Sequence, residues 1–503
     1  MTQHGTETDF ELTTIERLIN QGYRHTHGEE LNRPHKEVAL RDILRDHLMR
    51  RYPDLPERSL AEAIARFARP EGVDTLRRNM QFHLDLTKGI ELKVDRQDGK
   101  AEYRHVYAID WEHPEANEFQ VVNQLSVRGQ NDRRPDIVIF VNGLPLIVFE
   151  LKNPWAAKPS VEDALNQIGH YRHEIPQLFE FNALTVVSDG ITTLHGMWTA
   201  SREWFAPWKS IDGSNVEANT TGSMKTLIEG LFPREWLLAY IRDFILFEVA
   251  NDKITKKGAK YHQFFAVRLA ARKAVTTVTG GADRRIGVIW HTTGSGKSLS
   301  MAFLVGILRR EPLLANPSFV IQVDRTDLDD QIHDQFVAAR ALVGDVRHAE
   351  SVEQLRDLLR TQGGEVIFTT IEKFRLQGEI QHPVLSERAN LIVIADEAHR
   401  SQYGFLQGYA RYLAEALPNA RRIGFTGTPI SLHGADTVEV FGDVIHSYDI
   451  KQSQEDQTTV PIYYEPRQIR LQLNHSDVDA ALAEIVAGAE SMAWNARRAA
   501  GQP

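Results

Sequence analysis

The sequence predicts an α/β protein whose second half is a parallel β-sheet with helices on both faces. From about Lys256 onward, short apolar strands alternate with amphipathic helical stretches, a pattern typical of such sheets. In the stretch 297–310, for example, Met301, Leu304, Ile307 and Leu308 share one helical face. We expect strands at 286–290, 318–323, 365–369, 391–395 and 421–426.

Length and composition bound the number of domains and the class of protein. A chain of 503 residues corresponds to roughly two to four domains. Its 42% hydrophobic and 25% charged residues are typical of globular proteins. The sequence has no apolar run long enough to span a bilayer, no signal-peptide character and no cysteine, which excludes disulfides and thiolate zinc sites. We therefore expect a cytoplasmic protein.

A phosphate-binding loop is predicted where the strand at 286–290 runs into "HTTGSGKS" and then a helix. Lys297 would reach the β and γ phosphates of ATP, and Ser298 would ligate Mg²⁺. His291 replaces the first glycine of G-x-x-x-x-G-K-[ST], and a glycine-rich turn capping a core helix is the alternative for this segment alone. The backbone amides that would converge on the phosphates belong to the small residues Thr292, Thr293, Gly294, Ser295 and Gly296.

Two further polar clusters directly follow apolar strands of the same predicted sheet. Asp396 and Glu397 end the strand at 391–395, where an Asp can hold the Mg²⁺ shell and a Glu can polarise the attacking water. Thr426 and Thr428 lie in "TGTP" after the strand at 421–426, and their hydroxyls would link the nucleotide site to a bound strand. Three clusters in this order form a strong signal for ATP binding.

The order GSGKS, DEAH, TGTP resembles the first RecA-like motor domain of superfamily 2 helicases and translocases. The resemblance implies that Gln263 in "YHQFFAV" reads the adenine. The resemblance also implies that four residues lie near the path of the nucleic acid: Arg325, Asp327, Thr369 and Thr370. Such motors also need a second RecA-like domain that supplies arginine fingers, and no Q-x-x-G-R-x-x-R-like segment occurs before Pro503. We therefore expect a chain that binds ATP but is not a complete motor.

The front half contains "PDIVIFVNGLPLIVFELK" (135–152), which reads as two apolar strands around Asn142-Gly143. Asp136 and Glu150 would hold Mg²⁺ against a scissile phosphate, and Lys152 would orient the water or stabilise charge. A plain two-residue turn would place the two carboxylates on opposite faces. We therefore predict one extra residue near 142–145, as a bulge or a three-residue loop.

This set of residues resembles the PD-(D/E)xK nuclease core. Downstream, Gln167 and Tyr171 lie four residues apart on a predicted helix that opens with a Ser160–Asp163 capping box. Such a Q-x-x-x-Y pair resembles the accessory motif of RecB-like nucleases and type I restriction subunits. The resemblance further implies an extra carboxylate from the first helix, 10–23, supplied by either Glu11 or Glu16.

A PD-(D/E)xK nuclease ahead of a superfamily 2 motor resembles the restriction (R, HsdR) subunit of type I restriction-modification systems. The matching text includes "NEFQVVNQL", "DEAHRSQYG", "FTGTPI" and "FGDVIHSYDI". The resemblance implies an endonuclease domain over 1–250, a first RecA-like domain over 251–460, and the start of an incomplete second motor domain over 461–503.

The resemblance also implies the reaction and the partners. The subunit would join methyltransferase (modification) and specificity subunits, translocate double-stranded DNA with ATP, and cut unmethylated foreign DNA with Mg²⁺, away from any membrane. A net charge of −10 restricts DNA contacts to local stripes. The candidates are Arg133, Arg134, Lys253, Lys256, Lys257, Lys260, Arg268, Arg272 and Lys273.

Two other hypotheses compete with that of a type I restriction subunit. The first is a superfamily 2 helicase or repair protein whose N-terminal domain only binds DNA. The second is a non-catalytic fragment or interaction module. Type III restriction subunits are a nearer rival, but they carry the nuclease behind the motor.

Overall fold

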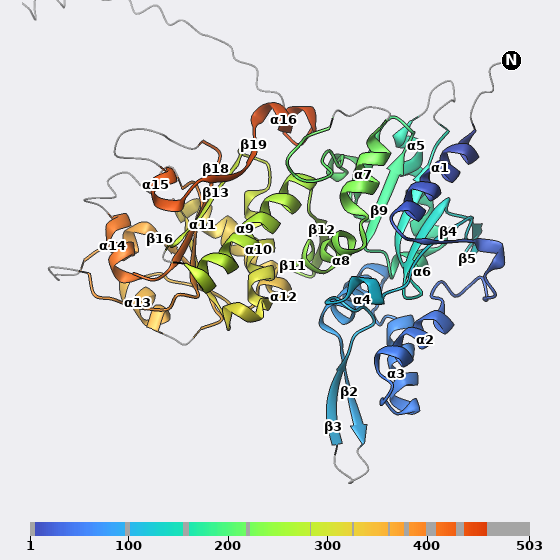
Figure 1. Ribbon diagram of the computed structural model, residues 1–503, viewed down its shortest axis with the longest axis horizontal. Coiled ribbons are helices and arrows are strands. Elements are labelled where there is room, and N and C mark those ends of the chain that lie inside the picture. Colours follow the sequence, from blue (N-terminus) through green and yellow to red (C-terminus); the bar gives the residue numbers. More distant parts are fainter. Residues whose placement is uncertain are drawn as a thin grey trace, which may run out of the picture. The chain divides into compact units, whose positions relative to one another are not determined.

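The computed structural model (Figure 1) describes residues 6–95, 101–153, 160–217, 222–281, 283–323, 326–360, 363–376, 382–398, 409–428 and 437–459. A six-stranded sheet lies within residues 24–196, and a seven-stranded sheet lies within residues 285–448. The mixed α/β class predicted from the sequence is therefore confirmed. The segment 461–503 lies outside the described residues.

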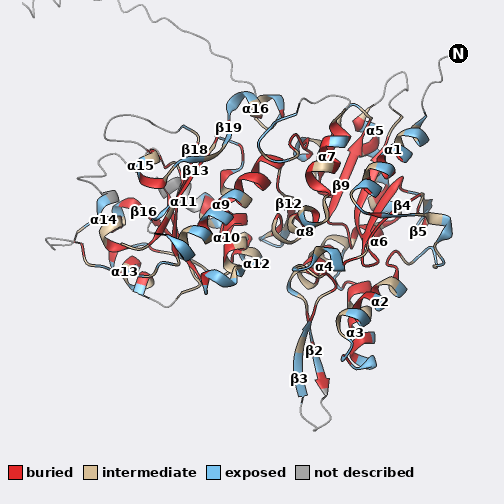
Figure 2. Cartoon of the chain, in the orientation of Figure 1, coloured by how far each residue is buried: buried red, intermediate tan, exposed pale blue. Residues whose placement is uncertain are grey.

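The six-stranded sheet is mixed, with the order β1-β4-β7-β8-β9-β10. The pairs β1/β4 and β8/β9 are parallel, and the other three pairs are antiparallel. Every residue of the central strands β7 and β8 is buried, as is every residue of the neighbouring β9, which Figure 2 shows in red. This burial explains why the β7–β8 stretch is almost entirely apolar. The strands are β1 (Arg24–His27), β4 (Phe119–Asn123), β7 (Ile137–Val141), β8 (Leu144–Leu151), β9 (Leu184–Ser188) and β10 (Thr193–Gly196).

Two helices bring polar side chains to this sheet. Helix α1 (Glu7–Asn20) contacts β1, β4 and β8, and helix α5 (Val161–Glu174) contacts β8 and β9. The Ser160 hydroxyl caps α5 by accepting a hydrogen bond from the amide of Glu162. The predicted capping box with Asp163 is therefore wrong, although the predicted helix is present. The other helices here are α2 (Arg41–Arg51), α3 (Glu57–Ala68), α4 (Thr75–Lys88), α6 (Pro176–Phe179), α7 (Ser223–Leu231) and α8 (Arg234–Asp243).

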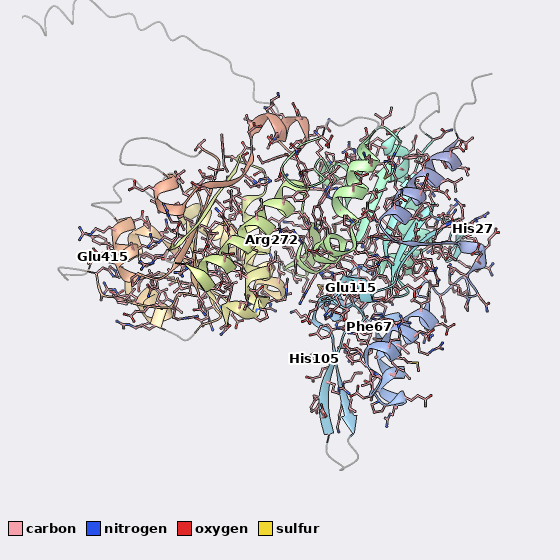
Figure 3. All side chains as sticks on the ribbon, in the orientation of Figure 1. His27, Phe67, His105, Glu115, Arg272 and Glu415 are labelled. Carbon is pink, nitrogen blue, oxygen red and sulfur yellow. The ribbon has the colours of Figure 1, made fainter. Side chains whose placement is uncertain are left out.

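Three small two-stranded sheets accompany the large ones. β2 (Ile90–Asp95) pairs with β3 (Ala101–Val106), whose exposed His105 is labelled in Figure 3, and β5 (Val127–Arg128) pairs with β6 (Asp132–Arg133). β11 (Ile245–Ala250) pairs with β12 (Lys253–Gly258), and the expected domain boundary near Ala250 falls at the turn of this hairpin. The domain limits at 250 and 460 stay predictions.

The seven-stranded sheet has the order β15-β16-β14-β17-β18-β13-β19, and all its pairs are parallel. The five predicted strands are confirmed. Strands β15 and β19 were not predicted; they lie at the two edges of the sheet and have a partly polar sequence. The strands are β13 (Arg285–His291), β14 (Ser318–Val323), β15 (Val346–His348), β16 (Val366–Thr370), β17 (Leu391–Ala395), β18 (Arg421–Thr426) and β19 (Val444–Tyr448).

Helices cover both faces of this sheet, as predicted. In β14, Phe319 and Ile321 join the hydrophobic cluster that contains residues of α9, α10 and α11, whereas Val320 joins the cluster of α13 and α14. No helix in the described part of the chain is long and apolar enough to cross a membrane. The helices are α9 (Tyr261–Gly280), α10 (Lys297–Arg310), α11 (Thr326–Ala338), α12 (Arg340–Val343), α13 (Val352–Arg360), α14 (Tyr409–Ala416), α15 (Thr437–Phe441) and α16 (Ile450–Glu455). Short 3₁₀ helices cover Gly28–Glu30, Pro114–Ala116, Arg202–Trp204, Pro312–Leu314 and Ile371–Phe374.

Candidate active sites

The β7–β8 hairpin contains the extra residue that the sequence requires. Val141 pairs with Leu144 across a two-residue turn, and Phe140 pairs with Pro145, but Ile139 pairs with Ile147. Leu146 is therefore a bulged residue, one position beyond the expected range of 142–145. Without this bulge, every later residue of β8 would face the other side of the sheet.

The bulge aligns the two predicted carboxylates. Ile137 pairs with Phe149, so the next position along the ladder sets Asp136 opposite Glu150, on the same face. The amide of Leu151 donates a hydrogen bond of 2.7 Å to Asp136 Oδ2. Both carboxyl groups belong to buried residues, with exposed fractions of 9% for Asp136 and 2% for Glu150.

Burial and mutual repulsion make these carboxyl groups costly to ionise together. Burial raises the pKa of Asp136 to about 8, and the negative charge of Glu150 adds to the shift. Burial also raises the pKa of Glu150, although Lys152 opposes the change. Glu150 Oε2 is buried and receives no hydrogen bond of normal geometry from the described residues. The pair therefore lacks part of the positive charge that two buried carboxylates need.

Lys152 lies beside the carboxylates, as the motif predicts. Its Nζ contacts Glu150 Oε1 at 2.6 Å. Burial lowers the pKa of Lys152, but attraction to Glu150 and Asp136 outweighs that effect, so its pKa is raised and the side chain is charged at neutral pH. One ammonium group therefore lies beside two carboxyl groups at this edge of the sheet.

The predicted accessory pair comes to the same place. Tyr171 of α5 is buried, its hydroxyl donates to the Arg134 carbonyl at 3.3 Å, and it interacts with both Glu150 and Gln167. Gln167 and Tyr171 therefore share one face of the helix, as their spacing predicts.

Of the two alternative positions on helix α1, Glu11 and Glu16, only Glu11 has its side chain turned into the protein. Glu11 is buried and accepts hydrogen bonds from Asn123 (2.7 Å) and Gln124 (2.9 Å). Glu16 is exposed, because it lies on another face of the helix. Glu7, one turn before Glu11, was not predicted, although its negative charge influences both Asp136 and Glu150. Helical spacing from Glu11 is the signal that could have pointed to it.

These residues fit a divalent cation with oxygen ligands. Mg²⁺ is bound through one or two carboxylates and keeps several waters, which is what a facing pair of carboxylates and a buried, unpartnered oxygen provide. Within the described ranges, no group of three or more His, Cys, Asp or Glu side chains is placed so that it could hold a metal ion by itself. A cation here would therefore take its remaining ligands from water or from a phosphate.

The predicted phosphate loop joins β13 to α10. Gly294 and Gly296 have φ values of +83° and +88°, and a Cβ atom on Gly296 would lie 2.6 Å from Gln263 Nε2. Lys297 opens helix α10 directly after Gly296, and Ser298 follows it. The loop therefore ends at the N-terminus of a helix, where backbone amides are available to an anion.

The strand-end acidic pair lies beside this loop. Lys297 Nζ contacts Glu397 Oε1 at 3.3 Å. Glu397 has a φ of +44°, an uncommon conformation for a non-glycine residue that occurs more often at functional sites. The amide of Asp396 donates to the Gln322 carbonyl, which continues the sheet ladder to the carboxylate. The structure therefore brings the GSGKS and DEAH segments together.

The TGTP segment reaches the same loop. Trp290 Nε1 donates to the Gly427 carbonyl at 3.0 Å, and a Cβ atom on Gly427 would lie 3.0 Å from Thr293 Oγ1. The Thr428 amide donates to Thr426 Oγ1 at 3.1 Å. All three polar clusters thus meet at one edge of the parallel sheet, as predicted from their positions after the strands.

Gln263 is engaged within the protein. Its Oε1 accepts from the Lys260 amide at 2.9 Å, and its Nε2 donates to the Gly296 carbonyl at 3.0 Å. The side chain therefore fixes the phosphate loop, a contact that the motif alone did not reveal. Of the other candidates, Thr369 and Thr370 end β16, whereas Arg325 and the side chain of Asp327 lie outside the described residues.

The expected basic stripe is not continuous at the surface. Lys256 is buried and donates to the Asn182 carbonyl, Lys257 pairs with Glu248, and Arg268 pairs with Glu235. The exposed members of that run are Lys253, Arg272, which is labelled on α9 in Figure 3, and Lys273. Beside the carboxylates, Arg133 pairs with Glu174, whereas Arg134 is exposed.

Comparison with known families assigns both halves of the chain. Residues 5–204 match the family described as type I restriction enzyme R protein N terminus, and residues 262–494 match the family described as SWI2/SNF2 ATPase. The first region contains the carboxylate pair, and the second contains the phosphate loop.

Curated relatives match almost the whole chain. The type I restriction enzyme HindI endonuclease subunit of Haemophilus influenzae is 42% identical over 95% of this chain and 48% of its own length. The putative type I restriction enzyme MjaIXP endonuclease subunit of Methanocaldococcus jannaschii is 34% identical over 94% of this chain and 47% of its own length. The chain thus spans about half the length of these relatives.

A solved fragment of a putative HsdR subunit of a type I restriction enzyme from Vibrio vulnificus YJ016 aligns with 67% of this chain and 56% of its own length. Its identity is 18% and its TM-score is 0.26, values too low to carry an argument about the fold. The family match to the N-terminal region and the identity to curated relatives do not depend on it. Residues 5–204 match the family described as type I restriction enzyme R protein N terminus, and nearly the whole chain is similar to about half of these endonuclease subunits.

Proposed function

We propose that this chain carries the DNA-cutting centre and the first ATP-binding motor domain of a type I restriction endonuclease. The observation that carries the proposal is the Leu146 bulge, which sets Asp136 opposite Glu150 beside Lys152. This arrangement supports a PD-(D/E)xK nuclease fold for the N-terminal region. The parallel sheet with its phosphate loop supports a RecA-like motor fold for the second region.

In the cutting centre, Asp136 and Glu150 would hold Mg²⁺, with Glu150 Oε2 as an available ligand atom. The bound cation would supply Lewis-acid stabilisation of the scissile phosphate. Lys152 would orient the attacking water and offset the negative charge that develops on the phosphate. Gln167 and Tyr171 would hold the carboxylate and the lysine in place, because Tyr171 interacts with both Gln167 and Glu150.

In the motor site, the amides from Thr292 to Gly296 and the ammonium of Lys297 would bind the phosphates of ATP. Lys297 would then exchange its contact with Glu397 for the β and γ phosphates. That exchange leaves the Glu397 carboxylate available to polarise the attacking water, while Ser298 and Asp396 hold Mg²⁺. Gln263 would read the adenine next to the loop it already contacts, and Thr426 and Thr428 would link the site to bound DNA.

As parts of a larger enzyme, these sites imply partners that the chain itself does not contain. We propose double-stranded DNA as the substrate, with modification and specificity subunits selecting unmethylated sites, and a cytoplasmic location alongside that DNA. A protein with an intact motor site whose N-terminal region only binds DNA is the main competing function.

The experiment is Mg²⁺-dependent cleavage of a plasmid by the R subunit assembled with its partners. We expect Asp136→Ala to abolish cutting while ATP hydrolysis continues, and Lys297→Ala to abolish both. The matched control is Asp132→Ala. Asp132 lies four residues before Asp136, but it is an exposed carboxylate that pairs with Arg128. Cutting that survives Asp136→Ala would contradict the assignment of the cutting centre and favour the competing function.

A further inference from the structure

A buried histidine and a buried tyrosine pack together and hydrogen-bond to the phosphate loop. His262 of α9 stacks on Tyr448 of β19, with ring centroids 3.7 Å apart and an angle of 7° between the planes. His262 Nε2 donates to the Ser295 carbonyl at 3.2 Å, and the Thr292 amide donates to the Tyr448 carbonyl at 2.9 Å. Two points of the loop therefore depend on where Tyr448 lies.

Tyr448 is in turn fixed by Asp456, which follows helix α16. The hydroxyls of Tyr448 and Tyr261 both donate to Asp456 Oδ2, at 2.8 Å and 2.9 Å. Helix α16 directly follows β19, so Asp456 lies only eight residues after Tyr448 and its carboxylate reaches back to the Tyr448 hydroxyl. Its carboxylate is 2% exposed, so it requires a compensating positive charge.

That charge comes from the N-terminal half of the chain. Lys209 Nζ contacts Asp456 Oδ1 at 2.6 Å, and the Lys209 side chain is only 7% exposed. The preceding residue, Trp208, packs against Phe264 and Phe265 of α9 with centroid distances of 5.3 Å and 5.8 Å. Lys209 is therefore held in position by the shared hydrophobic core, and not only by its partner.

We propose that Lys209 and Asp456 are positioning residues for the nucleotide site, acting on the phosphate loop through Tyr448 and His262. Removal of Lys209 leaves the buried Asp456 carboxylate without its ion-pair partner, so Asp456 turns toward water and releases the Tyr448 hydroxyl. The stacked His262 ring then loses its fixed support, and the Ser295 carbonyl loses its donor. The loop amides no longer converge on one phosphate position, and nucleotide affinity falls.

This inference rests on the proposed ATP site. It goes further, because it makes the nucleotide affinity of that site depend on Lys209, a residue of the N-terminal half. A loop that carries Lys209 belongs to the half of the chain with the carboxylate pair, whereas Ser295 belongs to the phosphate loop. Any movement of the 205–210 segment would thus change nucleotide affinity, and nucleotide binding would by linkage stabilise the Lys209–Asp456 contact.

The test measures the affinity of the 503-residue chain for the fluorescent nucleotide N-methylanthraniloyl-ATP. The parent chain is expected to bind it, and Lys297→Ala is expected to lose binding. We expect Lys209→Met and Asp456→Asn each to weaken binding roughly five-fold or more, within the usual range of coupling between sites. Lys209→Arg retains the charge and is expected to recover most of the affinity.

The matched control is Lys257→Met, which removes another lysine–carboxylate pair, with Glu248, away from the phosphate loop. A double-mutant cycle of Lys209→Met with His262→Phe separates positioning from general destabilisation. His262→Phe keeps an aromatic ring on Tyr448 but lacks the donor to Ser295. If Lys209 acts through His262, the double variant binds nucleotide about as weakly as His262→Phe alone.

Three outcomes overturn the inference. Unchanged nucleotide affinity in a folded Lys209→Met chain contradicts it while leaving the proposed function standing. Fully additive losses in the cycle show that Lys209 acts by another route. A parent chain that binds no nucleotide contradicts the proposed motor site and the inference together.

Discussion

The two candidate sites satisfy their charged groups in opposite ways. At the β7–β8 hairpin, two buried carboxyl groups lie opposite each other with one lysine paired to Glu150, and Glu150 Oε2 receives no hydrogen bond of normal geometry from the described residues. At the phosphate loop, Lys297 contacts Glu397, and Gln263 bonds to Gly296. The first site is organised before its ligand arrives, whereas the second must exchange internal contacts for ligand contacts.

This difference has an energetic consequence for each half of the chain. The hairpin site costs stability until a cation offsets its charge, because desolvated like charges repel. The phosphate-loop site costs little when empty, but its ligand must displace an ion pair. Neutralising a carboxylate should therefore stabilise the fold at the first site and raise ligand affinity at the second.

The largest effect is expected from deleting Val148, which lies between the bulge and Glu150. The deletion shifts the residues after it by one position, so Glu150 comes opposite Ile137, on the other face, and no longer lies opposite Asp136. We expect Mg²⁺-dependent plasmid cleavage by the assembled enzyme to fall by about 10²-fold or more, as for loss of other charge-stabilising groups.

The matched variant is Leu146→Ala, which keeps the residue count and the register. It should cost about 2–5 kcal/mol of stability through the cavity it leaves, yet retain cleavage by the folded fraction at low temperature. Equal loss of cleavage in both variants at matched folded fractions would show that register is not what the bulge provides.

The next effect concerns the ion pair of the phosphate loop. Glu397→Gln should free Lys297 for the phosphates, so we expect ATP affinity to rise by roughly three- to ten-fold, the worth of a partly exposed charge pair. ATP hydrolysis should nevertheless fall, because the group that polarises water is lost. Equilibrium binding and single-turnover hydrolysis measure the two quantities separately, and weaker binding in this variant would refute the exchange of contacts.

The hairpin site predicts a pH dependence of stability. Burial raises the pKa of Asp136 from 3.8 to about 8, so its proton is retained in the folded chain and lost from the unfolded chain between those values. The resulting stability is complete below about pH 4 and disappears as pH rises through about 8. In metal-free buffer, Asp136→Asn should flatten this slope and raise stability at pH 8 by roughly 1–3 kcal/mol.

Denaturant unfolding across that pH range checks this prediction, with Asp132→Asn as the exposed control. In metal-free buffer, the stability of the parent chain should change more with pH than that of Asp136→Asn. An equal or smaller change in the parent chain would contradict the account of the carboxylate pair.

The smallest effect is expected from Gln263. Its side chain makes one bond to the phosphate loop and one to the start of α9, so Gln263→Ala removes two neutral hydrogen bonds. We expect ATP affinity to fall by roughly ten-fold or less. A loss as large as that of Lys297→Ala would mean that Gln263 has a greater share in binding than these contacts indicate.

Sequence reasoning went furthest where the structure is local. The five strands follow from short-range patterns and are confirmed, and the GSGKS and DEAH segments lie at the strand ends where they were expected. The need for a bulge in the hairpin followed from counting residues between Asp136 and Glu150, but its place at Leu146 depends on packing against neighbouring strands. Glu7 was missed because only the folded helix shows which turn faces the carboxylates.

The contacts that no sequence pattern marked are long-range ones. His262 precedes the predicted adenine-reading Gln263, yet nothing in the sequence relates it to Tyr448, which is brought beside it by an edge strand that was not predicted. Lys209 and Asp456 are 247 positions apart and meet only in the folded core. Tertiary packing, and not local preference, decides such pairs.

The central claim is that Asp136 and Glu150 form a divalent-cation site in a chain whose nucleotide site is separate. Titration of Mn²⁺ into the nucleotide-free chain, followed by electron paramagnetic resonance, tests it most directly. We predict a bound ion in the parent chain and in Lys297→Ala, and its loss in Asp136→Ala. Mn²⁺ binding that is unaffected by Asp136→Ala would contradict the claim.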